Sequence, residues 1–242
     1  MNQYPQQPGG YGNVGLPSQV GVRPDVRLSV GFLSQAFAWM FAGLLLTAGI
    51  ASVVQSSPRL LEMARSLFLP AIVVELVVVF GITLLINRIN ALLALTLFFA
   101  YAALNGLTIG LIVSAYTTAS VAAAFVSAAG MFGAAAVYGA VTKRSLATMG
   151  GYLTMALFGL IIAMLVNLFL GSPLINYAIS VVGVIVFVGL TAWDTQRIAN
   201  GDLAVATRSM EKGAVIGALI LYLDFINLFL MLLRLFGGSG RR

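Results

Sequence analysis

The sequence contains neither cysteine nor histidine among its 242 residues. Without cysteine there can be no disulfide bond, thiolate nucleophile, zinc–thiolate site or cysteine-ligated iron–sulfur cluster. Without histidine there is no imidazole to act as a general acid or base, to complete a serine–histidine triad or to ligate a metal. These two absences exclude many common classes of enzyme and metal site, and no cofactor is predicted.

Charged side chains are also scarce. They make up 8% of the chain, against about 25% in an average soluble domain, while 60% of the residues are hydrophobic. Residues 89–142 and 145–193 contain no charged side chain at all. Since a membrane-spanning helix needs about 20 apolar residues, each of these stretches holds two spans and a turn. The composition therefore predicts an all-α polytopic membrane protein.

The net charge of +6 does not indicate a nucleic-acid partner. The basic residues stand singly or in pairs between apolar runs, whereas nucleic-acid-binding proteins gather them on one face. Isolated basic residues beside apolar runs are typical of the signals that set membrane topology. We expect this chain to contact membrane lipid and no nucleic acid.

Seven membrane-spanning helices are predicted from the apolar runs and from the residues that separate them. Their approximate bounds are Phe32–Val54, Leu69–Ile86, Ala91–Tyr116, Ser120–Val141, Tyr152–Leu170, Ile175–Asp194 and Ala214–Phe236. The preceding residues 1–27 are rich in Gln, Gly and Pro, a composition that predicts a disordered tail. The predicted organisation is this tail, a membrane domain over 28–237 and a short basic C-terminus over 238–242.

The distribution of basic residues predicts that the N-terminus is cytoplasmic. With the N-terminus inside, eight basic residues fall on the inner side and five on the outer side if the last helix crosses fully. Three of those five, Arg234, Arg241 and Arg242, would lie inside if the last segment re-entered the membrane. Asp224 at the centre of that segment also disfavours a simple span. The sequence is compatible with either a spanning or a re-entrant last helix.

Small residues at helical spacing predict close contacts between helices. Gly106 and Gly110 lie four residues apart on the third predicted helix, and Gly130, Gly133 and Ala134–Ala136 lie on the fourth. In lipid there is no hydrophobic force between helices, so backbones gain packing only by approaching closely. We interpret both sets as packing surfaces of a compact bundle rather than as ligand sites.

Three carboxyl groups fall within or at the edge of the apolar segments: those of Glu75, Asp194 and Asp224. An ionised group at the centre of a bilayer costs about 2.5 kcal/mol or more, so such a residue requires a partner, a water-filled cavity or a function. Asp224 bears this cost most fully, because it lies mid-helix among apolar residues. Asn227 lies one turn further along the same helical face. These residues form the candidate site.

Asp194 and Asp224 could form a pair if the last two helices are neighbours. Two carboxyl groups in one site of low dielectric constant tend to share a proton. Such a pair could sense protons, or could form an oxygen-only site for a hard cation such as Ca²⁺ when both groups are ionised. We therefore predict that Asp194 and Asp224 form the proton sensor and ion gate, and that they transiently ligate calcium.

Each carboxyl group also has a simpler structural interpretation. Asp194 could pair with Arg197 one turn later, and Asp224 could make a single hydrogen bond to a neighbouring helix. Glu75 lies about 20 Å along the helix from Arg88. A partner for Glu75 on another helix is therefore favoured over an ion pair between those two residues.

Two segments near the C-terminus resemble the signature of a known family. VGLTAWDTQRI at 188–198 and LYLDFINLF at 221–229 are similar to the last two signature helices of the Bax inhibitor-1, or transmembrane Bax inhibitor motif, family. Shorter segments, YGAVTKR at 138–144, Met149-Gly150 and Ile86-Asn-Arg88, resemble its bacterial branch. The resemblance covers residues 28–237 and leaves the N-terminal tail outside.

This resemblance implies both a fold and an activity. The fold would be a seven-helix bundle with the C-terminal helix at its centre, and the activity a pH-sensitive calcium leak through a bacterial inner membrane. Asp194 and Asp224 would correspond to the paired aspartates of the family. Arg88 would be the nearest candidate for an arginine that latches the closed state. Apart from the resemblance, the positions of Glu75 and Asn227 make them candidates for the same latch or network. The implied partners are membrane lipid, calcium ions, protons and other membrane proteins.

Three other function classes compete with the leak. An intramembrane aspartyl protease also uses two aspartates on adjacent helices, but its Gly-x-Gly-Asp pattern is missing at Asp224, and we do not expect an enzyme. A coupled transporter would show a matching pair of broken helices, which the sequence lacks. The main alternative is a regulatory membrane protein of stress or cell-death pathways that acts through helix contacts without transport. A variant lacking both aspartates that loses flux but keeps its cellular effect would favour that alternative.

Overall fold

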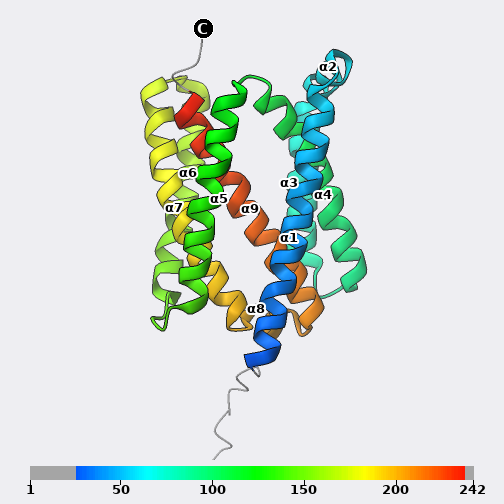
Figure 1. Cartoon of the computed structure of the whole chain (residues 1–242), viewed down its shortest axis with the longest axis vertical. Coiled ribbons are helices and arrows are strands. Elements are labelled where there is room, and N and C mark those ends of the chain that lie inside the picture. Colours follow the sequence, from blue (N-terminus) through cyan, green and yellow to red (C-terminus); the bar gives the residue numbers. More distant parts are fainter. Residues whose placement is uncertain (1–25, 238–242) are drawn as a thin grey trace, which may run out of the picture.

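The computed structural model describes residues 26–237, and most of this part of the chain is helical (Figure 1). The helices are α1 Val26–Gln55, α2 Pro58–Ser66, α3 Phe68–Leu85, α4 Ala91–Val113, α5 Thr118–Val141, α6 Ala147–Leu170, α7 Pro173–Ala199, α8 Asp202–Thr207 and α9 Met210–Gly237. Seven of these helices, all except α2 and α8, are long and apolar enough to cross a membrane. The prediction of an all-helical chain with seven spans is confirmed.

The helix ends follow from the residues between the apolar runs. Asn90, Thr117 and Ser172 each precede a helix and accept a hydrogen bond from the backbone N–H three residues later, at 2.7, 3.1 and 3.4 Å. Such side chains commonly satisfy the free N–H groups of a first helical turn. Gly171 follows α6 with a φ of 62°, a left-handed conformation that glycine adopts without strain. Local sequence therefore sets where these helices begin and end.

Several helices extend beyond the predicted spans. The starts of α1, α6 and α9 and the end of α7 include polar or charged residues that continue the helix past its apolar segment. The short helices α2 and α8 are additional, because neither is long enough to appear as an apolar span. The predicted tail and basic C-terminus fall outside the described residues, except that α1 begins at Val26, just before the predicted boundary.

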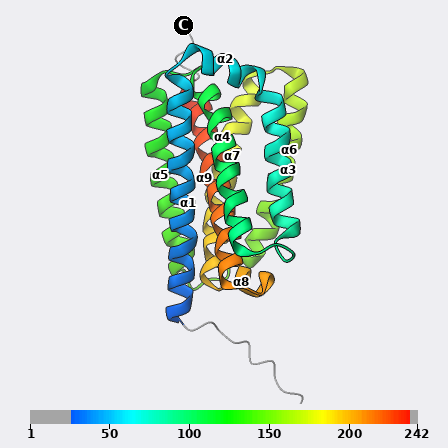
Figure 2. The same cartoon turned by 90° about the vertical axis from the view of Figure 1, so that its right-hand side faces the viewer.

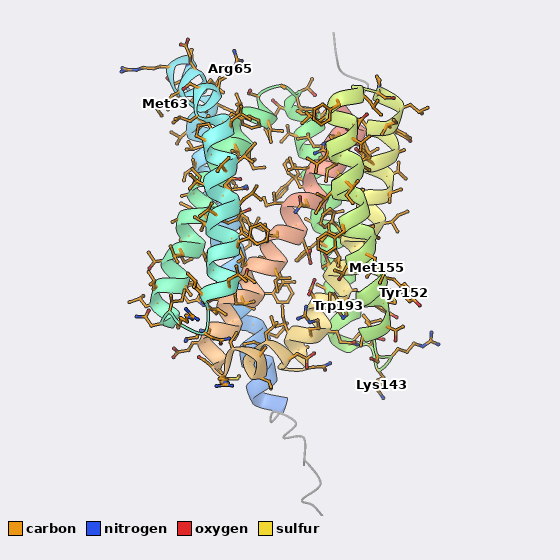
Figure 3. The ribbon with its side chains drawn as sticks, turned by 180° about the vertical axis from the view of Figure 1, so that it is seen from behind. Met63, Arg65, Lys143, Tyr152, Met155 and Trp193 are labelled. Atoms are coloured by element: carbon orange, nitrogen blue, oxygen red, sulfur yellow. The ribbon has the colours of Figure 1, made fainter. Side chains whose placement is uncertain are left out.

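The last helix, α9, forms the core of the bundle. It packs against α1, α4, α5, α7 and α8, and 78% of its most apolar segment is buried, compared with 6% for α6. Perpendicular views show α9 passing through the middle of the molecule (Figure 1, Figure 2). α3 packs mainly on α4, and α6 mainly on α7, with α9 between the two pairs (Figure 3). The predicted central position of the C-terminal helix is confirmed.

The same helix is unbroken and reaches both ends of the bundle. It begins beside α8 and ends at the opposite end, which also carries α2 (Figure 1). Its 28 residues correspond to a length of about 42 Å, which exceeds the bilayer hydrocarbon thickness of about 30 Å. Of the two arrangements compatible with the sequence, α9 has the geometry of a spanning helix.

The small residues of α4 provide the expected close contact with α1. A Cβ atom added at Gly106 would lie 2.8 Å from Cβ of Ile50, and one added at Gly110 would lie 3.0 Å from Cα of Ala51. Contacts this short leave no room for a side chain at either position. The backbones of α1 and α4 therefore approach each other through glycine, as the spacing of Gly106 and Gly110 predicts.

On α5 the predicted packing surface is only partly correct: of its alanines, Ala135 and Ala136 are buried, whereas Ala134 is exposed. Gly139 packs directly on the backbone of Ala192 in α7, whereas a Cβ atom added at Gly130 or Gly133 would meet no atom within 4 Å. The expectation of close contact at Gly130 and Gly133 is wrong. The residues of α5 that are buried against α7 and α9, such as Phe132, lie on a different face.

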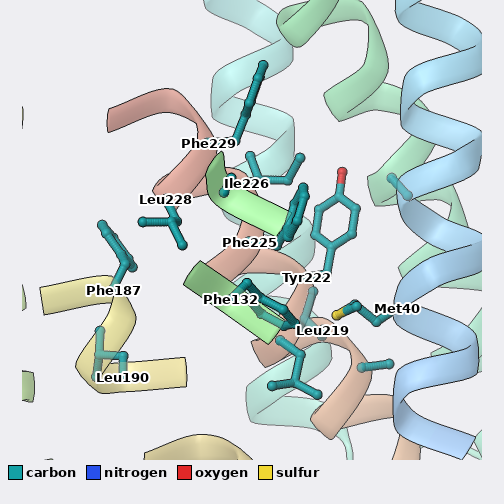
Figure 4. Close-up of a cluster of buried hydrophobic side chains, with 14 of the residues drawn as sticks. Met40, Phe132, Phe187, Leu190, Leu219, Tyr222, Phe225, Ile226, Leu228 and Phe229 are labelled. Carbon is teal, nitrogen blue, oxygen red and sulfur yellow. The ribbon is translucent and has the colours of Figure 1, made fainter. Parts of the chain in front are cut away.

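Aromatic rings fix the central helix against its neighbours (Figure 4). The Tyr222 ring of α9 meets the rings of Phe98 and Tyr101 from α4 edge to face, each at a centroid distance of 5.7 Å. Phe225 meets Phe132 of α5 in the same manner at 5.5 Å. Edge-to-face pairs of this kind contribute about 0.5–1.5 kcal/mol beyond the burial of area. They hold α9 in one rotation about its axis.

Candidate functional site

Asp194 lies near the end of α7, where it is 6% exposed. Its Oδ1 atom accepts a hydrogen bond from Nη1 of Arg197, one turn further on, at 3.0 Å. The Arg197 guanidinium also lies over the Trp193 ring, 4.5 Å from its centroid. This is the ion pair that the sequence offered as the simpler interpretation of Asp194. It is the one salt bridge found among the side chains of residues 31–237, the part whose side chains the structure describes.

Asp224 is buried at the centre of α9, with 5% of its surface exposed. Its Oδ2 atom has no hydrogen-bond partner among the described residues, and the same holds for the buried hydroxyl of Thr195 on α7. Buried polar atoms are normally hydrogen-bonded, because leaving them unpaired costs free energy. A carboxyl oxygen in this condition is a place where a proton, a water molecule or a cation would relieve that cost.

Two contacts define the register between α7 and α9. Gly183 of α7 lies against the side chain of Met231, and Ile198 of α7 lies against Gly217. The two helices therefore run antiparallel. Asp194 falls between the two α7 contact points, and Asp224 falls midway between the two α9 contact points.

Both aspartates lie on the faces through which α7 and α9 meet. Asp194 precedes Ile198 by one turn, and Asp224 is seven residues, or two turns, from both Gly217 and Met231. The two carboxyl groups are thus within about one turn of the same level. The structure thus places both predicted aspartates at the contact between α7 and α9. That they act as a pair stays a prediction.

Gln196 joins this end of α7 to the loop between α5 and α6. Its side-chain Oε1 accepts from the backbone N–H of Leu146 at 2.7 Å, and its Nε2 donates to the carbonyl of Arg144 at 2.8 Å. The sequence analysis did not single out Gln196. One signal was available in the sequence: Gln196 lies between Asp194 and Arg197 in the longest motif of the chain. A buried amide at that position requires partners for both its donor and its acceptor.

Trp193 makes a second contact at the same end. Its ring packs directly on Gly150 in the first turn of α6, and Figure 3 places Trp193 near the end of the molecule that carries Lys143. Because the Arg197 guanidinium stacks on the Trp193 ring and that ring contacts Gly150, the ion pair at Asp194 is connected to α6 through Trp193. A displacement of α7 here would move the start of α6.

Glu75, in the middle of α3, forms hydrogen bonds to a neighbouring helix, as the sequence favoured. Its Oε1 accepts from the Thr108 hydroxyl at 2.8 Å, and its Oε2 accepts from Asn105 Nδ2 at 3.3 Å. Asn105 Oδ1 accepts in turn from the Tyr222 hydroxyl at 3.1 Å, and that hydroxyl lies 2.6 Å from Oγ1 of Thr47 in α1. A continuous hydrogen-bonded network therefore connects α3, α4, α1 and the central helix.

Two other predicted site residues are not joined to the aspartates. Arg88 is exposed in the turn after α3 and makes no ion pair within the described residues. Asn227 donates from Nδ2 to the carbonyl of Leu223 in its own helix, at 2.8 Å. The guanidinium that meets Asp194 comes from Arg197. The assignment of Arg88 as a latch, and of Asn227 to the aspartate network, therefore stays a prediction.

Comparison with known proteins finds relatives along nearly the whole chain. The sequence model of a family described as "Inhibitor of apoptosis-promoting Bax1" matches residues 30–241. Over 223 residues the chain is 45% identical to the inner membrane protein YbhL of Escherichia coli K12, which covers 90% of this chain and 95% of that protein. It is 43% identical over 211 residues to an uncharacterized protein of Deinococcus radiodurans, covering 87% and 90%. A third relative, from Borreliella burgdorferi, is 39% identical over 220 residues, covering 89% and 95%.

Proposed function

The chain belongs to the Bax inhibitor-1 family of multi-pass membrane proteins, and from this premise we propose that it is a pH-sensitive calcium leak channel gated by Asp194 and Asp224. The observation that carries the proposal is the buried pair of carboxyl groups, in which Oδ2 of Asp224 lacks a hydrogen-bond partner. The proposed location is a bacterial inner membrane, as the name of the E. coli relative states for that protein. The N-terminus is proposed to be cytoplasmic.

We propose that the described conformation is the closed state of the leak. Asp224 is buried in the helix that fills the centre of the bundle. Asp194 is held by Arg197, and Gln196 ties the same end of α7 to the α5–α6 loop. For an ion to pass between α7 and α9, this end of α7 or the central helix has to move. We propose that such a movement opens the leak.

Protons control the charge of the site and therefore the balance between the two states. Adding a proton to Asp194 weakens its attraction to Arg197, whereas removing the last proton from the pair places two like charges close together in a medium of low dielectric constant. Both changes alter the free energy of the closed arrangement. The proton occupancy of the pair thus sets the fraction of open channels, and the pair titrates as one unit.

The ligand chemistry favours calcium over softer metals. Carboxylate oxygens are hard donors, and the chain has no cysteine or histidine to select zinc or copper. Two carboxylates supply at most about four of the roughly six to eight oxygens that Ca²⁺ takes, so water has to complete its shell. Weak coordination of this kind suits an ion that passes through rather than one that is stored.

The proposal is tested by measuring calcium flux into proteoliposomes at a series of pH values on both sides of neutrality. We expect the wild-type flux to change with pH, and Asp194→Asn and Asp224→Asn to abolish that response, because an amide cannot titrate. Asp202→Asn is the matched control: it removes an exposed acidic residue in α8, at the same end of the bundle as Asp194, and should leave both flux and pH response unchanged. Wild-type flux and pH response in both site variants would show that the proposal is wrong.

The family description favours a second candidate, a regulatory protein that acts on other membrane proteins without transport. A variant carrying both Asp194→Asn and Asp224→Asn distinguishes the two functions. Retention of its cellular effect in the absence of calcium flux would favour regulation through helix contacts. The matched family is not described as an enzyme family, and we propose no enzymatic activity.

A further inference from the structure

A polar cavity of about 450 Å³ lies where the end of α9 meets the turn between α6 and α7. These elements lie at the end of the bundle opposite α8 (Figure 1). The cavity is formed by the end of α9, the turn between α6 and α7, the start of α7 and the turn after α4. Its polar lining includes Tyr116, Asn167, Ser172, Asn176, Ser180 and Arg234. The volume falls within the range of about 300–1,000 Å³ that is common for small-molecule sites.

Arg234 supplies the charge of this cavity and has no acidic partner among the residues that the structure describes. It lies in the last turn of α9, half-buried, and the described contacts of its Nη1 atom are with sulfur, at 3.9 Å from Met164 and 3.7 Å from Met231. Thioether sulfur is a weak acceptor, so these contacts leave the hydrogen-bonding capacity of the guanidinium largely unused. No carboxylate side chain is found among the described residues that line the cavity.

The uncharged residues of the lining add further free hydrogen-bonding groups. Asn167 uses its Oδ1 to accept from the backbone N–H of Ser172 at 3.1 Å, which leaves its Nδ2 available. The side chain of Asn176 makes no hydrogen bond to the side chains or backbone described over residues 31–237, although its carbonyl accepts from Ser180. The ring of Tyr116 packs directly on Gly237 and closes one side. The cavity thus combines one cation with several neutral donors.

We propose that this cavity binds the phosphate group of an anionic membrane phospholipid, with Arg234 as the principal contact. A guanidinium matches the oxygens of a phosphate through two parallel hydrogen bonds, and the last turn of a spanning helix lies at the depth of the lipid headgroups. An unpaired cation that is partly removed from water is costly, and headgroup phosphates are the anions available at this depth.

The lining also distinguishes between headgroups. A glycerol headgroup carries hydroxyls that Asn167, Asn176 and Ser180 can hydrogen-bond. An ethanolamine headgroup carries an ammonium group, which would lie beside Arg234 with no carboxylate side chain in the described lining to balance it. The cavity therefore favours phosphatidylglycerol over phosphatidylethanolamine. This site involves neither Asp194 nor Asp224, so it stands independently of the proposed leak.

The full chain, purified and freed of lipid in detergent, provides the test. Thermal unfolding is followed while short-chain phosphatidylglycerol, phosphatidylethanolamine or inorganic phosphate is added. Phosphatidylglycerol should raise the unfolding temperature in a saturable manner, as a ligand of the folded state does, and phosphatidylethanolamine should do so more weakly. If inorganic phosphate alone produces the same rise, the site takes the free anion. If only the lipid does, the source is the headgroup.

Arg234→Gln should weaken phosphatidylglycerol binding about tenfold or more, because it removes the charged donor. Arg65→Gln is the matched control: Arg65 is an exposed arginine of α2 at the same end (Figure 3), and its loss should not change binding. Asn176→Asp keeps Arg234 in place and adds a negative charge to the lining, so it should also weaken binding, and it serves if Arg234→Gln does not fold. The proposal would be overturned by unchanged phosphatidylglycerol binding in Arg234→Gln or Asn176→Asp, or by an equal loss of binding in Arg65→Gln. It would also be overturned if phosphatidylglycerol did not raise the unfolding temperature of the wild type.

Discussion

Among single residues, the three intramembrane carboxyl groups occupy three different environments. Glu75 accepts hydrogen bonds from two neutral side chains, Asp194 faces a guanidinium, and Oδ2 of Asp224 faces no donor. Their chemistry is the same, so the difference arises from what the neighbouring helices present. Asp224 is the one whose charge state has the largest consequence for the packing around it, because nothing within the described chain compensates a charge there.

The ion pair at Asp194 gives a prediction at this scale. Arg197→Gln removes the counter-charge and the stacking on Trp193, so the closed arrangement of α7 should become less stable and the calcium leak should rise. Flux into proteoliposomes measures this effect. Arg144→Gln is the control, since the Arg144 side chain is exposed and only its backbone carbonyl meets Gln196. A leak in Arg197→Gln no higher than in the control would contradict the role assigned to the pair.

The sequence predicts which residues carry chemistry better than it predicts their partners. The cost of burying charge isolates the same three carboxyl groups that the structure finds in the bundle, and the Asp194–Arg197 pair follows from helical spacing alone. The partners of Glu75 could not be predicted, because Asn105 and Thr108 lie 30 and 33 residues away and meet it only when α3 packs on α4. Gln196 was missed for the same reason.

At the scale of helices, the pattern of apolar residues does not predict which face of a helix is buried in the bundle. A helix in lipid is apolar on all sides, so the face that packs on protein and the face that meets lipid have similar compositions. The small residues of α4 happen to lie on the contact face, whereas Gly130 and Gly133 of α5 do not. The bounds of the helices are more predictable than their packing faces, since serine, threonine, asparagine and glycine mark helix ends by hydrogen bonding and by backbone conformation.

Two glycines of the same helix provide a matched test of this packing. Gly139→Ala places a methyl group against the backbone of Ala192, which cannot move away cheaply, so we expect a loss of about 1–3 kcal/mol of stability. Gly133→Ala meets no atom within 4 Å and should be neutral or stabilising by up to about 1 kcal/mol, because alanine is the better helix former. Unfolding in mixed detergents measures both. Equal stability of the two variants would refute the described contact between α5 and α7.

For the whole molecule, the number of spans was predictable and their arrangement was not. Charge-free runs and polar breaks gave seven spans because the length of each is set by the bilayer. Hydropathy does not distinguish α9 from the helices around it, since all seven spans are strongly apolar. Its central place came from the family resemblance, and the contacts of α9 with α1, α4, α5, α7 and α8 now account for it.

The orientation of the whole molecule can be tested because the native chain has no cysteine. Single variants Glu62→Cys in α2 and Asp202→Cys in α8 place one thiol at each end of the bundle, both at exposed positions. If the N-terminus is cytoplasmic, a membrane-impermeant maleimide should label Glu62→Cys in cells whose outer membrane is permeabilised and whose inner membrane is intact. It should label Asp202→Cys only after the inner membrane is permeabilised as well. The reverse pattern would contradict the predicted orientation.

The position of α9 has a consequence for how the protein is made. The helix that fills the centre follows the six other described spans along the chain, so those spans leave the ribosome before the element that they surround. Until α9 is inserted, its partners on α1, α4, α5 and α7 face lipid or one another. We therefore expect the seven-span bundle to become compact only after α9 is inserted among its neighbours.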